Sequence, residues 1–103
     1  MRRSTRIPLD GSIEVDSGSG ILKGVTVVVN LHGALIRTIK PIATGSKIRV
    51  KMNQTGHAST AIVVYVASDN PLTSGIELET PQNIWGVQPA PADWQPSPPK
   101  KWN

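Results

Sequence analysis

Short runs in which every second residue is apolar dominate this chain, and glycine, proline or polar turn residues separate one run from the next. A period of two is typical of β-strands that bury one face, because successive side chains on a strand point to opposite sides of the sheet. Six such runs lie between residues 12 and 80, at residues 13–16, 25–29, 34–38, 47–52, 61–67 and 76–79. Their spacing predicts an all-β fold, a small six-stranded antiparallel barrel, because closing the sheet removes exposed strand edges.

The composition supports one compact, turn-rich domain. The 103 residues include nine glycines, nine prolines and no phenylalanine, and 38% of the residues are hydrophobic. This length suits a single domain, and the glycine and proline content is unfavourable for a helical bundle. No stretch approaches the roughly 20 consecutive apolar residues of a membrane span, and no apolar run follows the N-terminal arginines. We therefore expect a cytoplasmic protein with no secretory signal and no membrane partner.

The chain divides into two parts by composition. Residues 1–87 hold the predicted barrel and the N-terminal arginines, and residues 88–103 form a C-terminal extension with five of the nine prolines. Proline cannot donate to a strand ladder or continue a helix, so this part is predicted to be extended or disordered. We expect Trp85 and Trp94 to pack back onto the barrel by burying their rings, and Trp102, near the chain end, to stay in solvent.

The net charge of +4 is concentrated near the ends of the chain. Residues 7–87 carry six basic and six acidic side chains and are neutral, whereas Arg2, Arg3 and Arg6 supply three positive charges. Arg2 and Arg6 lie about 13 Å apart along an extended backbone, and guanidinium groups form bidentate hydrogen bonds with phosphates and stack on purines. The segment predicts either a local anion site or a solvated basic terminus, rather than a face that binds polyanions in general.

Several functional classes are excluded by what the chain lacks. It has no cysteine, which excludes disulfides, thiol nucleophiles and cysteine metal centres. His32 and His57 are the only histidines and have no third ligand at metal spacing, so no metal site is predicted. No nucleophile elbow or glycine-rich phosphate loop is present, so we do not expect an enzyme. With Tyr65 as the only tyrosine, the chain also lacks the stacking aromatics of DNA- and RNA-binding barrels.

A polar turn at residues 30–33 interrupts two apolar runs, about 25 residues after the N-terminal Arg-x-x-x-Arg of Arg2 and Arg6. These features, with the Gly-Ile-Glu-Leu-Glu run at residues 75–79, resemble the PilZ domain, the bacterial receptor module for cyclic di-GMP. The resemblance covers roughly residues 2–80 and implies a six-stranded antiparallel barrel. It also implies a ligand site built from an Arg-x-x-x-Arg loop and an Asp/Asn-x-Ser-x-x-Gly motif.

Carried over position by position, the resemblance implies six ligand-binding residues: Arg2, Arg3, Arg6, Asn30, His32 and Gly33. Gly33 matches the motif glycine, whereas Asn30 stands where the family has serine and Val28 where it has Asp or Asn. Val28 cannot accept a hydrogen bond from a guanine edge, a loss of about 1.5–3 kcal/mol or roughly one to two decades in affinity. Asn30 can replace the serine because an amide both donates and accepts.

The polar turn also permits an interpretation without a ligand. Asn30 is then a turn residue that bonds to its own backbone, and His32 a half-exposed loop residue rather than a group that stacks on a base. Two hypotheses follow. The first is a cyclic di-GMP receptor that needs no cofactor and signals to a downstream protein partner when the arginine loop docks. The second is a barrel with a degenerate second motif that keeps the fold, does not bind the nucleotide, and works as a protein-interaction module.

Overall fold

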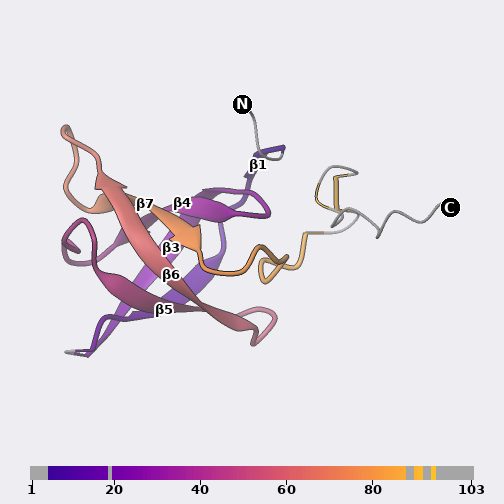
Figure 1. Ribbon diagram of the computed structural model, residues 1–103, viewed down its shortest axis with the longest axis horizontal. Coiled ribbons are helices and arrows are strands. Elements are labelled where there is room, and N and C mark those ends of the chain that lie inside the picture. The colour runs from indigo at the N-terminus through magenta and orange to yellow at the C-terminus, as the bar shows by residue number, and fades with distance from the viewer. Residues whose placement is uncertain (1–4, 19, 88–89, 92–93, 95–103) are drawn as a thin grey trace, which may run out of the picture.

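The computed structural model describes residues 5–18, 20–87, 90–91 and 94, and these residues form seven strands (Figure 1). The strands are β1 (Ile7–Pro8), β2 (Ser12–Asp16), β3 (Ile21–Val29), β4 (Gly33–Thr38), β5 (Lys47–Met52), β6 (Ala58–Val66) and β7 (Thr73–Leu78). No helix among the described residues has the length and apolarity needed to cross a membrane. Trp102, which the sequence predicts to be in solvent, lies outside this part of the chain.

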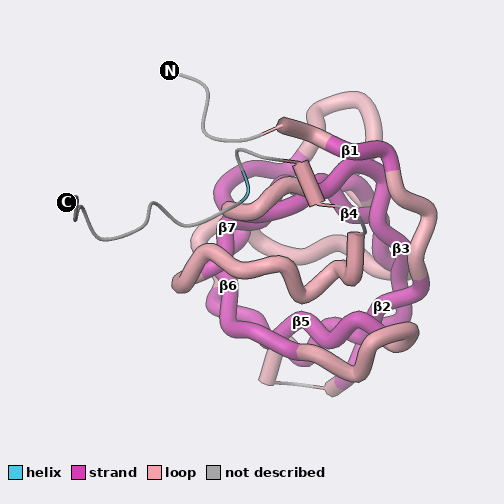
Figure 2. Tube along the Cα trace, turned by 90° about the vertical axis from the view of Figure 1, so that its right-hand side faces the viewer, coloured by secondary structure: helices cyan, strands magenta, loops and turns pink. Residues whose placement is uncertain are grey.

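Six of the strands close into a barrel. The hydrogen-bonded order is β1-β3-β2-β5-β6-β7-β4, and a further pairing of β3 with β4 completes the ring, which Figure 2 shows as a closed circuit of strands. Neighbouring strands are antiparallel throughout. The predicted all-β, six-stranded antiparallel barrel is therefore confirmed. The sequence does not predict β1, because a strand of two residues has no periodicity and forms only by pairing with β3.

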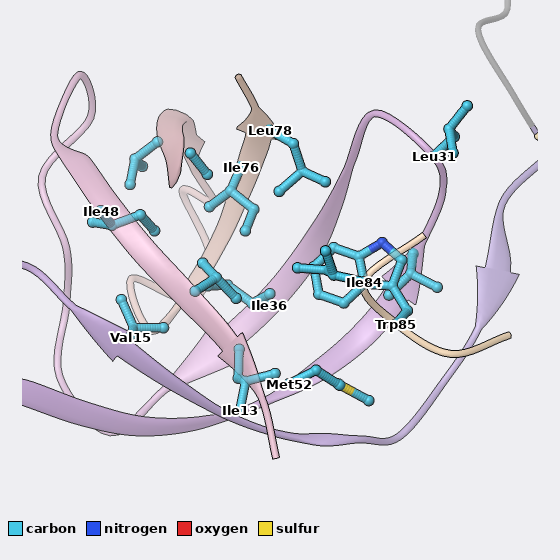
Figure 3. Close-up of a cluster of buried hydrophobic side chains, with 14 of the residues drawn as sticks. Ile13, Val15, Leu31, Ile36, Ile48, Met52, Ile76, Leu78, Ile84 and Trp85 are labelled. Atoms are coloured by element: carbon cyan, nitrogen blue, oxygen red, sulfur yellow. The ribbon is translucent and has the colours of Figure 1, made fainter. Parts of the chain in front are cut away.

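The interior of the barrel is filled by the inward-facing residues of the six strands. Ile13, Val15, Ile36 and Val50 are fully buried, as the alternation in their runs predicts. Figure 3 shows that Trp85, from the segment after β7, lies among these core side chains. Trp85 and Trp94 are each 2% exposed, so the expected packing of both rings is confirmed. The core therefore includes Trp94, which lies beyond residue 87, where the sequence places the start of the C-terminal extension.

One polar group in this core has no partner. Ser74 on β7 is 0% exposed, and its hydroxyl makes no hydrogen bond within the described part of the chain. An unsatisfied buried hydroxyl is unfavourable by about 1–3 kcal/mol, so Ser74→Ala should raise the free energy of unfolding by about 1 kcal/mol. Urea unfolding tests this, with Thr38→Ala as the control, because the buried Thr38 hydroxyl donates to the Lys40 carbonyl at 2.6 Å. Thr38→Ala should lower the free energy of unfolding. A decrease for Ser74→Ala as well would contradict the prediction.

Candidate functional site

An open groove with a volume of about 590 Å³ lies on the outer side of the barrel. Residues of β1, β3, β4, β6 and β7 and of the turn between β3 and β4 line it. The described lining residues are Arg6, Pro8, Val28, Val29, Asn30, His32, Gly33, Ala34, Leu35, Val64, Tyr65, Gly75, Ile76 and Glu77. This volume falls within the roughly 300–1,000 Å³ typical of small-molecule sites.

The floor of the groove follows one row of cross-strand partners. Pro8 pairs with Val28, Val28 with Leu35, Leu35 with Gly75, and Gly75 with Tyr65, and all five residues line the groove. Neighbouring strands lie roughly 4.8 Å apart, so this row runs about 19 Å across the barrel surface. The floor is apolar along its whole length and ends on the aromatic ring of Tyr65.

Two β-bulges bring Val28 and Tyr65 into the groove. One interrupts the β3–β4 register between Thr26 and Val28, and the other interrupts the β6–β7 register between Val63 and Tyr65. Without the extra residue, strict alternation would direct Val28 and Tyr65 inward like their neighbours at i−2. Tyr65 is instead 50% exposed and the bulged Val64 46% exposed, whereas Val63 is fully buried. The bulges therefore shape the groove floor.

Tyr65 is a site residue that the sequence does not predict. Its ring lies against the Cα of its partner Gly75, where an added Cβ would overlap the ring edge. Glycine thus lets the ring lie against β7, and Tyr65 remains 50% exposed. The sequence feature that could have indicated Tyr65 is the nearly continuous apolar run at residues 61–67. In this run Val64 and Tyr65 break the alternation expected of a strand with one solvent-exposed face.

Asn30 organises the polar end of the groove. Its side-chain Oδ1 accepts hydrogen bonds from the backbone N–H groups of His32, at 2.9 Å, and Gly33, at 2.8 Å. The backbone carbonyl of Asn30 accepts a further bond from the Trp85 indole at 2.9 Å. The turn-residue interpretation of Asn30 is therefore confirmed. No described residue accepts a hydrogen bond from the Nδ2 amide of Asn30. The Oδ1 atom therefore holds the turn, and the Nδ2 amide can donate to a ligand.

Gly33 stands at a point of close backbone approach. It pairs with Glu77 on β7, and a Cβ at residue 33 would overlap the carbonyl oxygen of Ile76 and lie 3.1 Å from the Glu77 Cα. The glycine of the second motif therefore has a steric role here, because it lets β4 and β7 meet at the groove. Glu77 itself is half-buried and is the only acid among the described lining residues. Glu77 alternates with Ile76 and Leu78, a pattern that predicts a solvated outer face, whereas the structure places Glu77 in the lining of the groove.

Hydrogen bonds to β3 position Arg6, the last residue of the arginine segment (residues 2–6), at the rim of the groove. Ile7 pairs with Val29, and the Leu9 N–H donates to the Val27 carbonyl at 3.1 Å. The buried hydroxyl of Thr26 donates to the Leu9 carbonyl at 2.6 Å and accepts from the Gly11 N–H at 2.9 Å. These contacts tether the chain directly after Arg6.

Four of the six predicted site residues therefore meet in one groove: Arg6, Asn30, His32 and Gly33. Arg2 and Arg3 lie outside the described residues. Val28, the departure from the second motif, lies in the groove floor between Pro8 and Leu35. Among the described residues, no three His, Cys, Asp or Glu side chains are grouped as a metal site would require.

The other charged surface of the barrel is balanced. Lys51 and Arg49, on the outer face of β5, stand directly opposite Glu14 and Asp16 of β2. Opposite charges at facing positions of an antiparallel pair attract one another, so this face is a mixed rather than a uniformly basic surface. It lacks the single-sign charge of a polyanion-binding face.

Comparison with known proteins agrees with the fold. A search of curated proteins returned no match. A family model for the PilZ domain matches residues 1–84, which is most of the 103 residues of the chain. The matched range begins before the arginine segment and ends after β7, so it contains both motifs and the whole barrel. The protein is therefore a member of the PilZ domain family, a family of receptor-type binding modules.

Proposed function

We propose that the groove binds cyclic di-GMP and that the protein is a receptor of bacterial second-messenger signalling. The observation that carries the proposal is the convergence of Arg6, from the N-terminal segment, with Asn30, His32 and Gly33 in a single groove of a PilZ domain. The barrel provides a rigid surface, and an altered arginine segment on that surface is what a downstream protein partner would recognise. We place this function in the cytoplasm, without cofactor or metal.

The chemistry of the groove matches the parts of the ligand. The Arg6 guanidinium, together with Arg2 and Arg3 of the same segment, can form charge-assisted hydrogen bonds with the two phosphates. The apolar floor suits a base plane, and the half-exposed Tyr65 ring at its end is a stacking surface. The Nδ2 amide of Asn30 can donate to a base oxygen, and Glu77 can accept from the N–H groups on a guanine edge.

Calorimetric titration with cyclic di-GMP tests the role of the arginine segment. Arg6→Ala should weaken binding at least tenfold, because one guanidinium provides both phosphate hydrogen bonds and stacking. Arg49→Ala is the matched control, since it removes the same charge from the outer face of β5, outside the groove. Equal affinities of the Arg6→Ala and Arg49→Ala variants would rule out a specific contact by Arg6.

Val28→Asp should strengthen binding in the same assay, by about one decade or more, because it restores the acceptor for a guanine edge in the groove floor. The fold should tolerate the carboxylate, since Val28 faces the groove and not the core. Val25→Asp is the matched control: Val25 lies on the outer face of the same strand, is 37% exposed and does not line the groove. An equal gain from Val25→Asp would show that the gain does not require a carboxylate in the groove and would contradict the prediction.

The alternative function, a protein-interaction module without nucleotide binding, is favoured by a separate observation. Val28, Val64 and Tyr65 make much of the groove apolar and accessible, and accessible apolar surface is typical of protein contacts. The two functions predict different titrations. If the wild type gives no heat at high micromolar ligand and the Val28→Asp, Asn30→Ser double variant binds, the barrel is a degenerate receptor and its function is a protein contact.

A further inference from the structure

Two tryptophans from the end of the chain hydrogen-bond to the backbone on the two sides of the groove. The indole N–H of Trp94 donates to the carbonyl of Thr5 at 2.7 Å, and Thr5 directly precedes Arg6. The indole N–H of Trp85 donates to the carbonyl of Asn30 at 2.9 Å. Both rings are 2% exposed, and the two hydrogen bonds are partly buried. Thr5, at the described end of the arginine segment, and the polar turn are therefore both held by residues after β7.

The described residues around these tryptophans form local hydrogen bonds of their own. Asn83 holds a turn in which its Oδ1 accepts from the N–H groups of Gly86 and Val87 and its Nδ2 donates to the Val87 carbonyl. The Trp94 N–H donates to the Pro91 carbonyl at 2.9 Å, and Val87 packs against the core. Trp85 and Trp94 both lie outside residues 1–84, the range that the PilZ model matches. The barrel of this protein is thus packed against two tryptophans that lie after the matched range.

We propose that Trp94 is a positioning residue that sets the place of the arginine segment on the barrel and thereby the affinity of the groove for its anionic ligand. The ligand part of this proposal rests on the proposed function. The contacts to β3 begin at Ile7 and hold the chain after Arg6, whereas the Trp94 bond holds the residue before it. With both sides held, Arg6 loses less conformational freedom when a phosphate binds, and preorganisation of this kind increases affinity.

Coupling between two sites is reciprocal, so the ligand should in turn stabilise the contact of Trp94. A change in the position of residues after β7, such as contact with a partner protein, would alter ligand affinity through the same hydrogen bond. The Trp94 side chain thus connects the C-terminal extension to the groove. It donates to the carbonyl of Thr5, and Thr5 is bonded to Arg6.

Trp94→Phe tests the proposal, because it keeps a buried ring and removes the N–H donor. In calorimetry with cyclic di-GMP we expect about fivefold weaker binding, the effect of one hydrogen bond. In the Arg6→Ala background the same change should have almost no further effect, because Trp94 acts through the arginine segment. Ile48→Val, a core substitution on β5 outside the groove, controls for general loss of stability and should leave affinity unchanged. Unchanged affinity of Trp94→Phe, or equal losses in both backgrounds, would overturn the proposal.

A second measurement needs no ligand and separates this proposal from the proposed function. Trypsin cleavage after Arg6, followed by mass spectrometry of the product that starts at Ile7, reports how often the segment leaves the barrel. Trp94→Phe should accelerate this cleavage at least fivefold, and Ile48→Val should not. If the wild type does not bind cyclic di-GMP and the acceleration is found, the proposed function fails and the positioning role stands. Unchanged cleavage overturns the positioning role whatever the ligand does. If Trp94→Phe does not fold, slow hydrogen exchange of the wild-type Trp94 indole N–H supports the role, and rapid exchange overturns it.

Discussion

Gly33→Ala is expected to destabilise the barrel by about 3 kcal/mol or more, at or above the usual range for overpacking a core. The new Cβ would overlap the Ile76 carbonyl oxygen, which is main chain. A closed barrel cannot relieve the overlap by moving one strand outward, because β4 and β7 are each paired on both sides. The midpoint of thermal unfolding should fall by at least 10 °C, given roughly 4–8 °C per kcal/mol for a domain of this size.

Gly45→Ala is the control for this prediction because it separates steric overlap from backbone conformation. Gly45 has a φ of 89°, which disfavours a side chain, but nothing lies within 4 Å of an added Cβ. Its replacement should be unfavourable by about 1 kcal/mol through the backbone alone. If the midpoint of thermal unfolding of Gly33→Ala equals or exceeds that of Gly45→Ala, β4 does not approach β7 as closely as described.

Trp85→Ala is expected to lower the free energy of unfolding by about 3–5 kcal/mol, the range for removing a large buried aromatic side chain. The ring is 2% exposed within the core, and its N–H also satisfies the Asn30 carbonyl. Trp85→Phe should lower the free energy of unfolding by less, because most of the buried aromatic surface remains. Urea unfolding measures both, and Trp102→Ala, at the position predicted from sequence to be in solvent, should leave stability unchanged.

The same measurement on shortened chains tests where the domain ends. A chain that stops at residue 84, where the family match stops, loses both buried tryptophans and should not fold stably at 25 °C. A chain that stops at residue 94 should keep most of the stability of the full protein, because Trp94 and the residues packed on the core remain. Equal stabilities of the two chains would contradict the role given to residues 85–94.

The strands could be predicted because a strand that buries one face has apolar residues at every second position. The run at residues 47–52, with three basic residues alternating with Ile48, Val50 and Met52, corresponds to β5 residue for residue. β3, β6 and β7 begin earlier than predicted, at Ile21, Ala58 and Thr73. Their first residues lie in polar or glycine-containing stretches, where pairing with a neighbouring strand, and not hydrophobicity, extends the strand.

The candidate site could be predicted only in part. The arginine segment and the polar turn are visible in the sequence because their residue types are unusual between apolar runs, and the family resemblance connects them. Tyr65 and Glu77 could not be assigned in this way, since their place in the groove depends on a bulge in β6 and on the register of β7 against β4. A shift of one residue in either register would turn these side chains to the other face.

The sequence by itself determined the all-β class, the number of barrel strands, the burial of Trp85 and Trp94, and the family. Each of these depends on residue type and local spacing, which a chain carries whatever its three-dimensional arrangement. Only the tertiary structure decided the strand β1, the groove between segments far apart in the chain, and the hydrogen bond from Trp94 to Thr5 across 89 positions. The reason is physical: a backbone carbonyl, such as that of Thr5, is the same group in every residue, so its partner is selected by packing and leaves no pattern in the sequence.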